Sequence, residues 1–241
     1  MKWPTRIVAV ATAALVLTGC WPKTESYRYK LTLAVNTPAG LMQASSVAEV
    51  RFWGIVIPDR GVTHQLRGEA LYLDLGAGRR PLIALITKQL RRKAGQEASW
   101  SRDGGPNGPF IARIYEKALS ENLLEQAAAI SRMRGAREIG PADLPDLVTF
   151  ADINNPSSVI EVDPNDLQAA LGPDVSWNKI TLEITDEPIT TGLTAKLSWL
   201  PEYFKKNLRL DGSDHGAKPV LSNKLDWSDF AQTTNELKRS Q

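Results

Sequence analysis

The chain has 241 residues, of which 42% are hydrophobic and 23% are charged, and it contains one cysteine and two histidines. This composition is that of an ordinary globular protein, and it excludes a disulfide scaffold, a collagen-like protein and a wholly disordered chain. Because zinc sites are built mainly from cysteine and histidine, we expect no metal site, and no motif indicates a cofactor.

The first twenty residues have the pattern of a processing signal. Lys2 and Arg6 precede an uncharged run, Ile7 to Leu17, which is too short to span a bilayer. The run leads into Leu17-Thr18-Gly19-Cys20, which resembles the lipobox of bacterial lipoproteins. The resemblance implies that residues 1–19 are cleaved, that a diacylglycerol is attached to Cys20, and that the new amino group is acylated. The alternative is a plain secretory peptide in which the cysteine has no role.

A lipid-modified N-terminus predicts both location and partners. Two or more acyl chains hold a protein stably on a membrane, so we expect anchoring at the periplasmic face through Cys20, with residues 20–26 as tether. Trp21 stands where lipoproteins carry sorting information, and it leaves inner and outer membrane both open. Cleavage removes Lys2 and Arg6 from the 29 basic residues and none of the 27 acidic ones, so the mature charges balance. This balance gives no reason to expect nucleic-acid binding.

Alternation of apolar and polar residues predicts three strands at the start of the mature chain. It runs over 27–36, over 48–57 and over 71–75, with Thr37-Pro38-Ala39-Gly40 as turn material between the first two. Three sequential strands with short connections favour an antiparallel meander.

The centre of the chain is predicted to be helical. Leu82, Leu85, Ile86 and Leu90 fall at helical spacing after Pro81. A Gly/Pro-rich loop over 95–109 is followed by helix-forming residues over 111–133, which end near a glycine at 135. The two helices are expected to cover one face of the sheet.

The last third returns to strands, at 147–151, 159–162, 180–184 and 193–199. Asp163-Pro164-Asn165-Asp166 predicts a helix N-terminus with Asp163 as the cap, and Gly172-Pro173 ends that helix. Residues 206–241 are polar and are predicted to form a peripheral tail. The expected fold is therefore a single α+β domain over 27–205, with a mainly antiparallel sheet backed by helices.

Part of this region also resembles uncharacterised proteobacterial envelope proteins. The similarity is carried by Leu147 to Asp152, Asp163-Pro164-Asn165-Asp166-Leu167, Ile180-Thr181-Leu182-Glu183-Ile184-Thr185-Asp186 and Thr190-Thr191-Gly192. It implies a Gram-negative source and carries no function that could be transferred.

One candidate binding site follows the third predicted strand. Gly76-Ala77-Gly78 lies where a dinucleotide-binding loop would place its glycines, but Pro81 replaces the third glycine, which favours a plain turn. A weaker alternative is an anion site formed by Gly78, Arg79 and Arg80 at a helix N-terminus. The predicted helix and its start carry no acid and six basic residues, Arg79, Arg80, Lys88, Arg91, Arg92 and Lys93. Such a run indicates either a solvated face or a patch that binds anionic headgroups or cell-wall material.

Carboxylates supply the second candidate chemistry, because paired acids can bind calcium or act as general acid and base. Eight acids gather in the last half of the chain: Asp143, Asp146, Asp152, Asp163, Asp166, Glu183, Asp186 and Glu187. Most stand beside proline or asparagine, in positions typical of turns and caps. Asp211 to Gly216 is similar to a calcium loop, but Ser222 stands where the bidentate Glu is required.

Nucleophilic catalysis has no motif in the chain. There is no Gly-x-Ser-x-Gly, and His64 and His215 have no recognisable serine partner. We therefore expect a non-catalytic envelope lipoprotein that binds or scaffolds at the periplasmic membrane surface, with an envelope protein as a candidate partner. The alternatives are a hydrolase that acts on envelope glycan or lipid through paired carboxylates, and an anion- or lipid-binding module built on Arg79 and Arg80.

Overall fold

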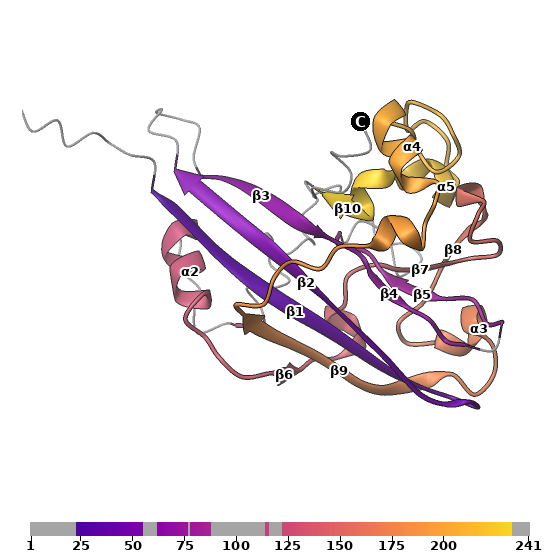
Figure 1. The fold of residues 1–241 in the computed structure, drawn as a ribbon, viewed down its shortest axis with the longest axis horizontal. Coiled ribbons are helices and arrows are strands. Elements are labelled where there is room, and N and C mark those ends of the chain that lie inside the picture. Colours follow the sequence, from indigo (N-terminus) through magenta and orange to yellow (C-terminus); the bar gives the residue numbers. More distant parts are fainter. Residues whose placement is uncertain (1–22, 55–61, 77, 88–113, 116–121, 233–241) are drawn as a thin grey trace, which may run out of the picture.

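The computed structural model describes residues 23–54, 62–76, 78–87, 114–115 and 122–232. Within these residues ten strands form two antiparallel sheets, accompanied by four short α-helices (Figure 1). The predicted α+β class with a mainly antiparallel sheet is confirmed. None of the helices in these ranges is long and apolar enough to cross a bilayer.

The larger sheet has six strands in the order β10-β3-β2-β1-β9-β6. Their bounds are β1 Thr24–Thr37, β2 Gly40–Gly54, β3 Val62–Glu69, β6 Arg137–Glu138, β9 Ser176–Thr185 and β10 Ala231–Gln232. The predicted pairing of the first two strands is confirmed, because β1 and β2 pair antiparallel. The third strand of the predicted meander is wrong: β2 pairs next with β3, which the mostly polar sequence did not predict, whereas the strand predicted over 71–75 belongs to the second sheet. Alternation in β1 buries Tyr27, Tyr29 and Leu31 on one face, and it leaves the opposite face polar.

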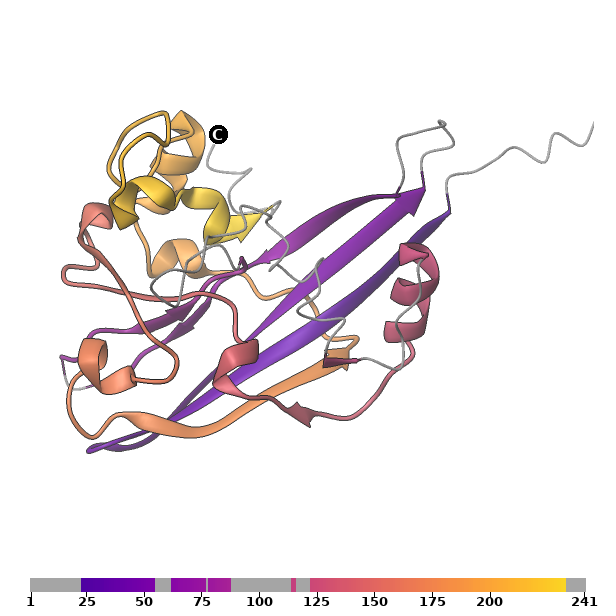
Figure 2. The same ribbon diagram turned by 180° about the vertical axis from the view of Figure 1, so that it is seen from behind.

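The smaller sheet lies between the larger sheet and the C-terminal helices. Its order is β4-β5-β7-β8, with bounds Leu71–Leu73, Leu82–Ala84, Leu147–Phe150 and Val159–Glu161. Leu82 and Ala84 face the core shared with the larger sheet, whereas Ile83 and Leu85 face a second core that includes Trp199 and Phe230. Figure 2 shows the resulting three layers from behind.

The helix predicted to start after Pro81 is wrong, because residues 82–84 form β5. A strand buried on both faces shows a continuous apolar run, and such a run cannot be told from a buried helix by its period. The prediction for Lys88 to Lys93 lies outside the described residues, as does that for Cys20.

Four α-helices are described, and α2 Leu123–Ile130 confirms part of the second predicted helix. The others are α3 Leu167–Leu171, α4 Leu200–Lys206 and α5 Leu221–Lys224. Asp166 caps α3, so the prediction of Asp163 as the cap is wrong; the Asp163 carboxylate accepts instead from Asn165 N, 2.8 Å away. The strands predicted at 147–151, 159–162 and 180–184 are confirmed as β7, β8 and β9.

The strand predicted at 193–199 is also wrong. The 3₁₀ helix η5, Leu193–Ala195, leads through a turn into α4. Leu193, Leu197 and Leu200 are buried and stand four and then three residues apart, which is helical spacing. The buried residues follow helical spacing, and Trp199 is buried beside them. The apparent alternation of apolar and polar residues was therefore not the sign of a strand.

The peripheral tail predicted from residue 206 is wrong for the described part, which extends to residue 232. Leu210, Leu225 and Phe230 are fully buried in the second core. Backbone hydrogen bonds also fix this segment, because Ala70 N donates to Phe230 O at 2.7 Å and β10 pairs with β3. A few widely spaced large apolar residues thus fix a segment whose average composition is polar. Figure 1 shows that it contains α5 and, at the edge of the larger sheet, β10.

Candidate functional site

The predicted anion site at Gly78, Arg79 and Arg80 has no helix N-terminus. Gly78 has φ +70°, and Arg79 N donates to Gly76 O at 2.9 Å, so the segment is a turn from β4 into strand β5. The Arg79 guanidinium reaches Leu171 O, 3.5 Å away at the end of α3. Arg79 therefore stabilises a helix C-terminus, where a cation is favourable, and Arg80 lies exposed beside it.

The predicted carboxylates have local roles and do not converge. Asp152 accepts from Asn154 N at 3.0 Å, and Asp166 accepts from Ala169 N at 3.2 Å, as turn and cap residues do. Other acids of the set form ion pairs on the larger sheet: Glu183 and Glu187 with Lys30, and Asp186 with Arg134. Asp143 lies in the 3₁₀ helix η3, Pro141–Asp143, and Asp146 is buried. No group of three or more His, Cys, Asp or Glu residues in the described ranges could hold a metal.

Neither histidine is placed to activate a serine. The exposed His215 ring contacts the Asp214 carboxylate, and Ser213 Oγ donates to the backbone carbonyl of His215, not to its ring. The His64 ring lies against Phe52, with 6.0 Å between the ring centres. Acyl transfer requires a serine or cysteine hydrogen-bonded to a histidine ring. Neither histidine makes such a contact with a described residue.

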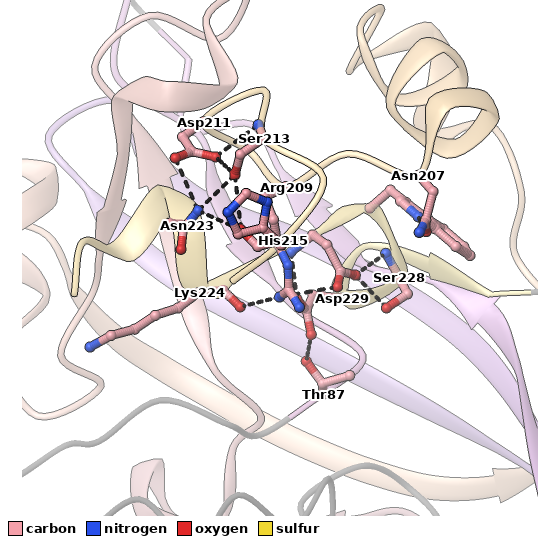
Figure 3. Close-up of polar contacts among 12 residues, drawn as sticks. Thr87, Asn207, Arg209, Asp211, Ser213, His215, Asn223, Lys224, Ser228 and Asp229 are labelled. Carbon is pink, nitrogen blue, oxygen red and sulfur yellow. Dashed lines mark hydrogen bonds and ion pairs between the residues drawn. The ribbon is translucent and has the colours of Figure 1, made fainter. Parts of the chain in front are cut away.

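The site that sequence reasoning missed is a hollow of about 360 Å³ at the C-terminal end of the fold. Its volume falls in the range of small-molecule sites. Three of the residues that line it are cations. The full lining is Arg209, Gly216, Ala217, Lys218, Pro219, Asn223 and Lys224. We call it the C-terminal pocket, and Figure 3 shows its polar groups.

Asn223, which is 1% exposed, organises the loop that forms one wall of the pocket. Its Nδ2 donates to Asp211 Oδ2 at 3.0 Å, to Ser213 Oγ at 2.7 Å and to the carbonyl of His215 at 3.1 Å. Its Oδ1 accepts from Lys218 N at 2.7 Å. Both ends of the amide are therefore satisfied, and the four bonds fix residues 211–218 around one buried side chain (Figure 3).

Asp211 holds the Lys218 side chain at the rim of the pocket. Lys218 Nζ lies 2.7 Å from Asp211 Oδ2, and Ser213 N donates to Oδ1 at 3.0 Å. The Lys218 ammonium, followed by the Ser213 hydroxyl, holds the pKa of the Asp211 carboxyl well below its usual range. Asp211 is consequently ionised across the physiological pH range.

Arg209 forms the floor of the pocket. Its Nη1 donates to Lys224 O at 3.0 Å and lies 3.3 Å from Asp226 Oδ2. Gly216 lies against the guanidinium, where an added Cβ would be 3.4 Å from Cζ. The loop therefore packs directly on the Arg209 side chain.

The lining of the pocket carries a positive excess. Arg209 is paired with Asp226 and Lys218 with Asp211, whereas Lys224 forms no ion pair in the part of the chain that the structure describes. Figure 3 shows the Lys224 side chain extending away from the network. With two cations anchored and a third unpaired, the pocket favours a negatively charged ligand, and its lining offers no nucleophile with a base.

Asp229 connects this end of the fold to the segment that follows β5. This carboxylate is 1% exposed; it accepts from Thr87 Oγ1 at 2.7 Å and from Asp226 N at 2.9 Å. It thereby closes a capping box on the 3₁₀ helix η6, Trp227–Asp229. Asp226, the acid that pairs with Arg209, is thus itself held through its backbone by the buried Asp229.

The only sequence signal for this site was the run of turn residues from Asp211 to Gly216, which resembled a calcium loop. Its partners Arg209 and Asn223 lie on either side and are joined only by folding. Comparison of the chain with protein-family models, with curated proteins and with solved structures finds no match.

Proposed function

We propose that this protein is a lipoprotein of the bacterial envelope, anchored at the periplasmic membrane face through Cys20, which binds an anionic ligand without catalysing its conversion. The observation that carries the binding role is the C-terminal pocket, with a loop held by Asn223, two anchored cations and Lys224, which has no ion-pair partner among the described residues. A pre-formed concave site with few convergent polar groups is typical of small-ligand binding.

The anchoring role is supported by the lipobox and by where the fold begins. β1 starts at Thr24, four residues after Cys20. Four extended residues span at most about 14 Å, so a lipid on Cys20 would hold the start of β1 close to the headgroups. The chain would therefore present a folded domain directly at the membrane surface.

The hydrolase alternative has less support. Asp186 lines a hollow beside β1, but the second acid there is Glu49, whose carboxylate is already engaged by three arginines. Most of the remaining candidate acids have cap, turn or ion-pair roles, and no contact among the described residues places two of them across a cleft.

Anchoring is tested by labelling cells with a fatty-acid analogue and separating membrane from soluble fractions. The wild-type chain is expected in the membrane fraction, with label, and as a product shortened by residues 1–19. A Cys20→Ser variant should lose the label and keep its signal segment. A wild-type chain that is unlabelled and released to the periplasm would contradict the anchoring proposal.

A further inference from the structure

Three arginines converge on one glutamate on the polar face of the larger sheet. Arg28, Glu49 and Arg67 stand directly opposite one another on β1, β2 and β3, and Arg51 follows two residues along β2. The distances to the Glu49 carboxylate are 3.0 Å from Arg67 Nη1, 3.4 Å from Arg28 Nε and 3.5 Å from Arg51 Nη2. We call these four residues the Glu49 cluster.

The cluster has more positive charge than its fold requires. The Glu49 side chain is 5% exposed, and one well-placed arginine would suffice to neutralise it. Three arginines leave two positive charges in excess, and like charges side by side on adjacent strands oppose folding. The nearby acids cancel only part of this excess. Glu183 and Glu187 share Lys30, at 3.8 and 2.7 Å, and Asp186 pairs with Arg134 at 3.5 Å, so a net positive charge remains.

The cluster also has more hydrogen-bond donors than acceptors. A guanidinium has about five N–H donors. Within the described residues, Arg51 and Arg67 contact no acceptor except Glu49, which leaves most of their donors without a protein partner. Their side chains are 43% and 29% exposed, so these donors are within reach of a ligand from solvent.

A hollow of about 250 Å³ adjoins the cluster and supplies further polar groups. Arg28 and Glu49 line it together with the hydroxyl-bearing residues Ser26, Ser131 and Thr185. Arg28 is held in place there by the backbone carbonyls of Asp186 and Glu187, at 3.3 and 3.2 Å. The guanidinium is thus fixed beside a polar, open recess.

We infer that the Glu49 cluster is a binding site for an oxyanion of the phosphate class, separate from the C-terminal pocket. A phosphate carries one to two negative charges and several acceptor oxygens, which match the excess charge and the unused arginine donors. Glu49 has the role of holding the three guanidinium groups together before the ligand arrives, so that their mutual repulsion is overcome in the folded chain.

The phosphate group bound by the Glu49 cluster could belong to a lipid headgroup or to a free phosphate ion. Arg28 lies four residues along β1 from Thr24, a distance of about 13 Å at the usual strand rise. If Cys20 is anchored as proposed above, headgroups lie near this end of the sheet; only the choice of source rests on that proposal. Binding itself depends on the cluster alone.

The experiment uses the mature chain, residues 20–241, with Cys20→Ser to remove lipidation. Calorimetric titration with inorganic phosphate tests the free ion, and co-flotation with phosphatidylcholine vesicles, with and without phosphatidylglycerol, tests the headgroup. Arg51→Gln is the key variant, because Arg51 makes the longest contact to Glu49 and Arg28 and Arg67 still pair with it. Lys179→Gln is the matched control, since Lys179 lies on β9 of the same sheet and forms no ion pair with a described residue. Thermal unfolding of each variant confirms that it is folded.

We expect Arg51→Gln to weaken binding to the probe by about tenfold, and Lys179→Gln to change it by less than about twofold. Binding to inorganic phosphate assigns the free ion, whereas binding confined to phosphatidylglycerol vesicles assigns the headgroup. The inference is overturned if neither probe binds, or if Arg51→Gln and Lys179→Gln bind equally. It is also overturned if Lys224→Gln abolishes the binding, because the anion would then belong to the C-terminal pocket.

Discussion

Replacing Asn223 with alanine tests whether one buried amide organises the C-terminal pocket. Asn223 makes four hydrogen-bond contacts, but its Nδ2 has two hydrogens for three acceptors, so the contacts amount to about three full bonds of about 1 kcal/mol net each. Removal leaves Lys218 N–H without its acceptor and Asp211 without one of its donors. Because the loop can relax and admit water, the expected loss is less than the full sum, at about 2 kcal/mol of unfolding free energy.

The assay is urea unfolding of the unlipidated mature chain, combined with amide hydrogen exchange at Lys218. The Asn223→Ala variant should lose exchange protection at Lys218 N–H as well as global stability. Asn178→Ala is the control, because Asn178 is exposed and makes a single side-chain bond to Asn36 at 3.2 Å; its cost should stay below about 0.5 kcal/mol. A loss below about 1 kcal/mol in Asn223→Ala, with Lys218 N–H still protected, would refute the role assigned to Asn223.

Three further predictions follow from the same contacts. Phe230→Ala should cost about 3–5 kcal/mol in urea unfolding, because Phe230 is fully buried against Trp199 and Phe150; a cost under about 1 kcal/mol would restore a peripheral tail. The lowered pKa of Asp211 contributes stability that is complete above the unfolded value of about 3.9 and is lost as pH falls through the folded value. Acid titration of unfolding free energy below about pH 4 should therefore fall less steeply in Asp211→Asn than in wild type, and equal slopes would argue against the Lys218 pairing. Arg79→Ala should lower stability by about 0.5–1 kcal/mol through the end of α3 and leave phosphate titration unchanged, whereas lost phosphate binding would reinstate an anion site at the turn.

The strand β3 was missed because its sequence, Val62–Glu69, is mostly polar. The strand β1 could be predicted because it has one buried and one solvated face. Tyr27, Tyr29 and Leu31 alternate with polar residues for that reason. The same reasoning failed at Leu82, since β5 is buried on both faces and its period disappears. It failed again near Phe230, where isolated large side chains fix a segment of polar composition.

The candidate site was beyond sequence reasoning for a different reason. Its chemistry depends on Asn223 folding back on Asp211 and on Arg209 lying under Gly216, and neither contact has a periodic signal. Acids, cations and turn residues in this stretch each had an adequate local explanation. These residues form a pocket only when the loop over 211–218 closes around Asn223. Lys224 then lies in the lining without an ion-pair partner among the described residues.

The central claim is anion binding in the C-terminal pocket, and the most direct measurement is a nuclear magnetic resonance titration of the isotope-labelled, unlipidated mature chain with a panel of carboxylates and phosphates. We predict saturable amide shifts in residues 209–226 with at least one anion, and this binding should be weakened by about tenfold in Lys224→Gln. The shifts should be retained in Lys205→Gln, a control on α4 whose lysine has no ion pair with a described residue. The absence of shifts in this segment with every anion, or equal binding by the two variants, would contradict the account.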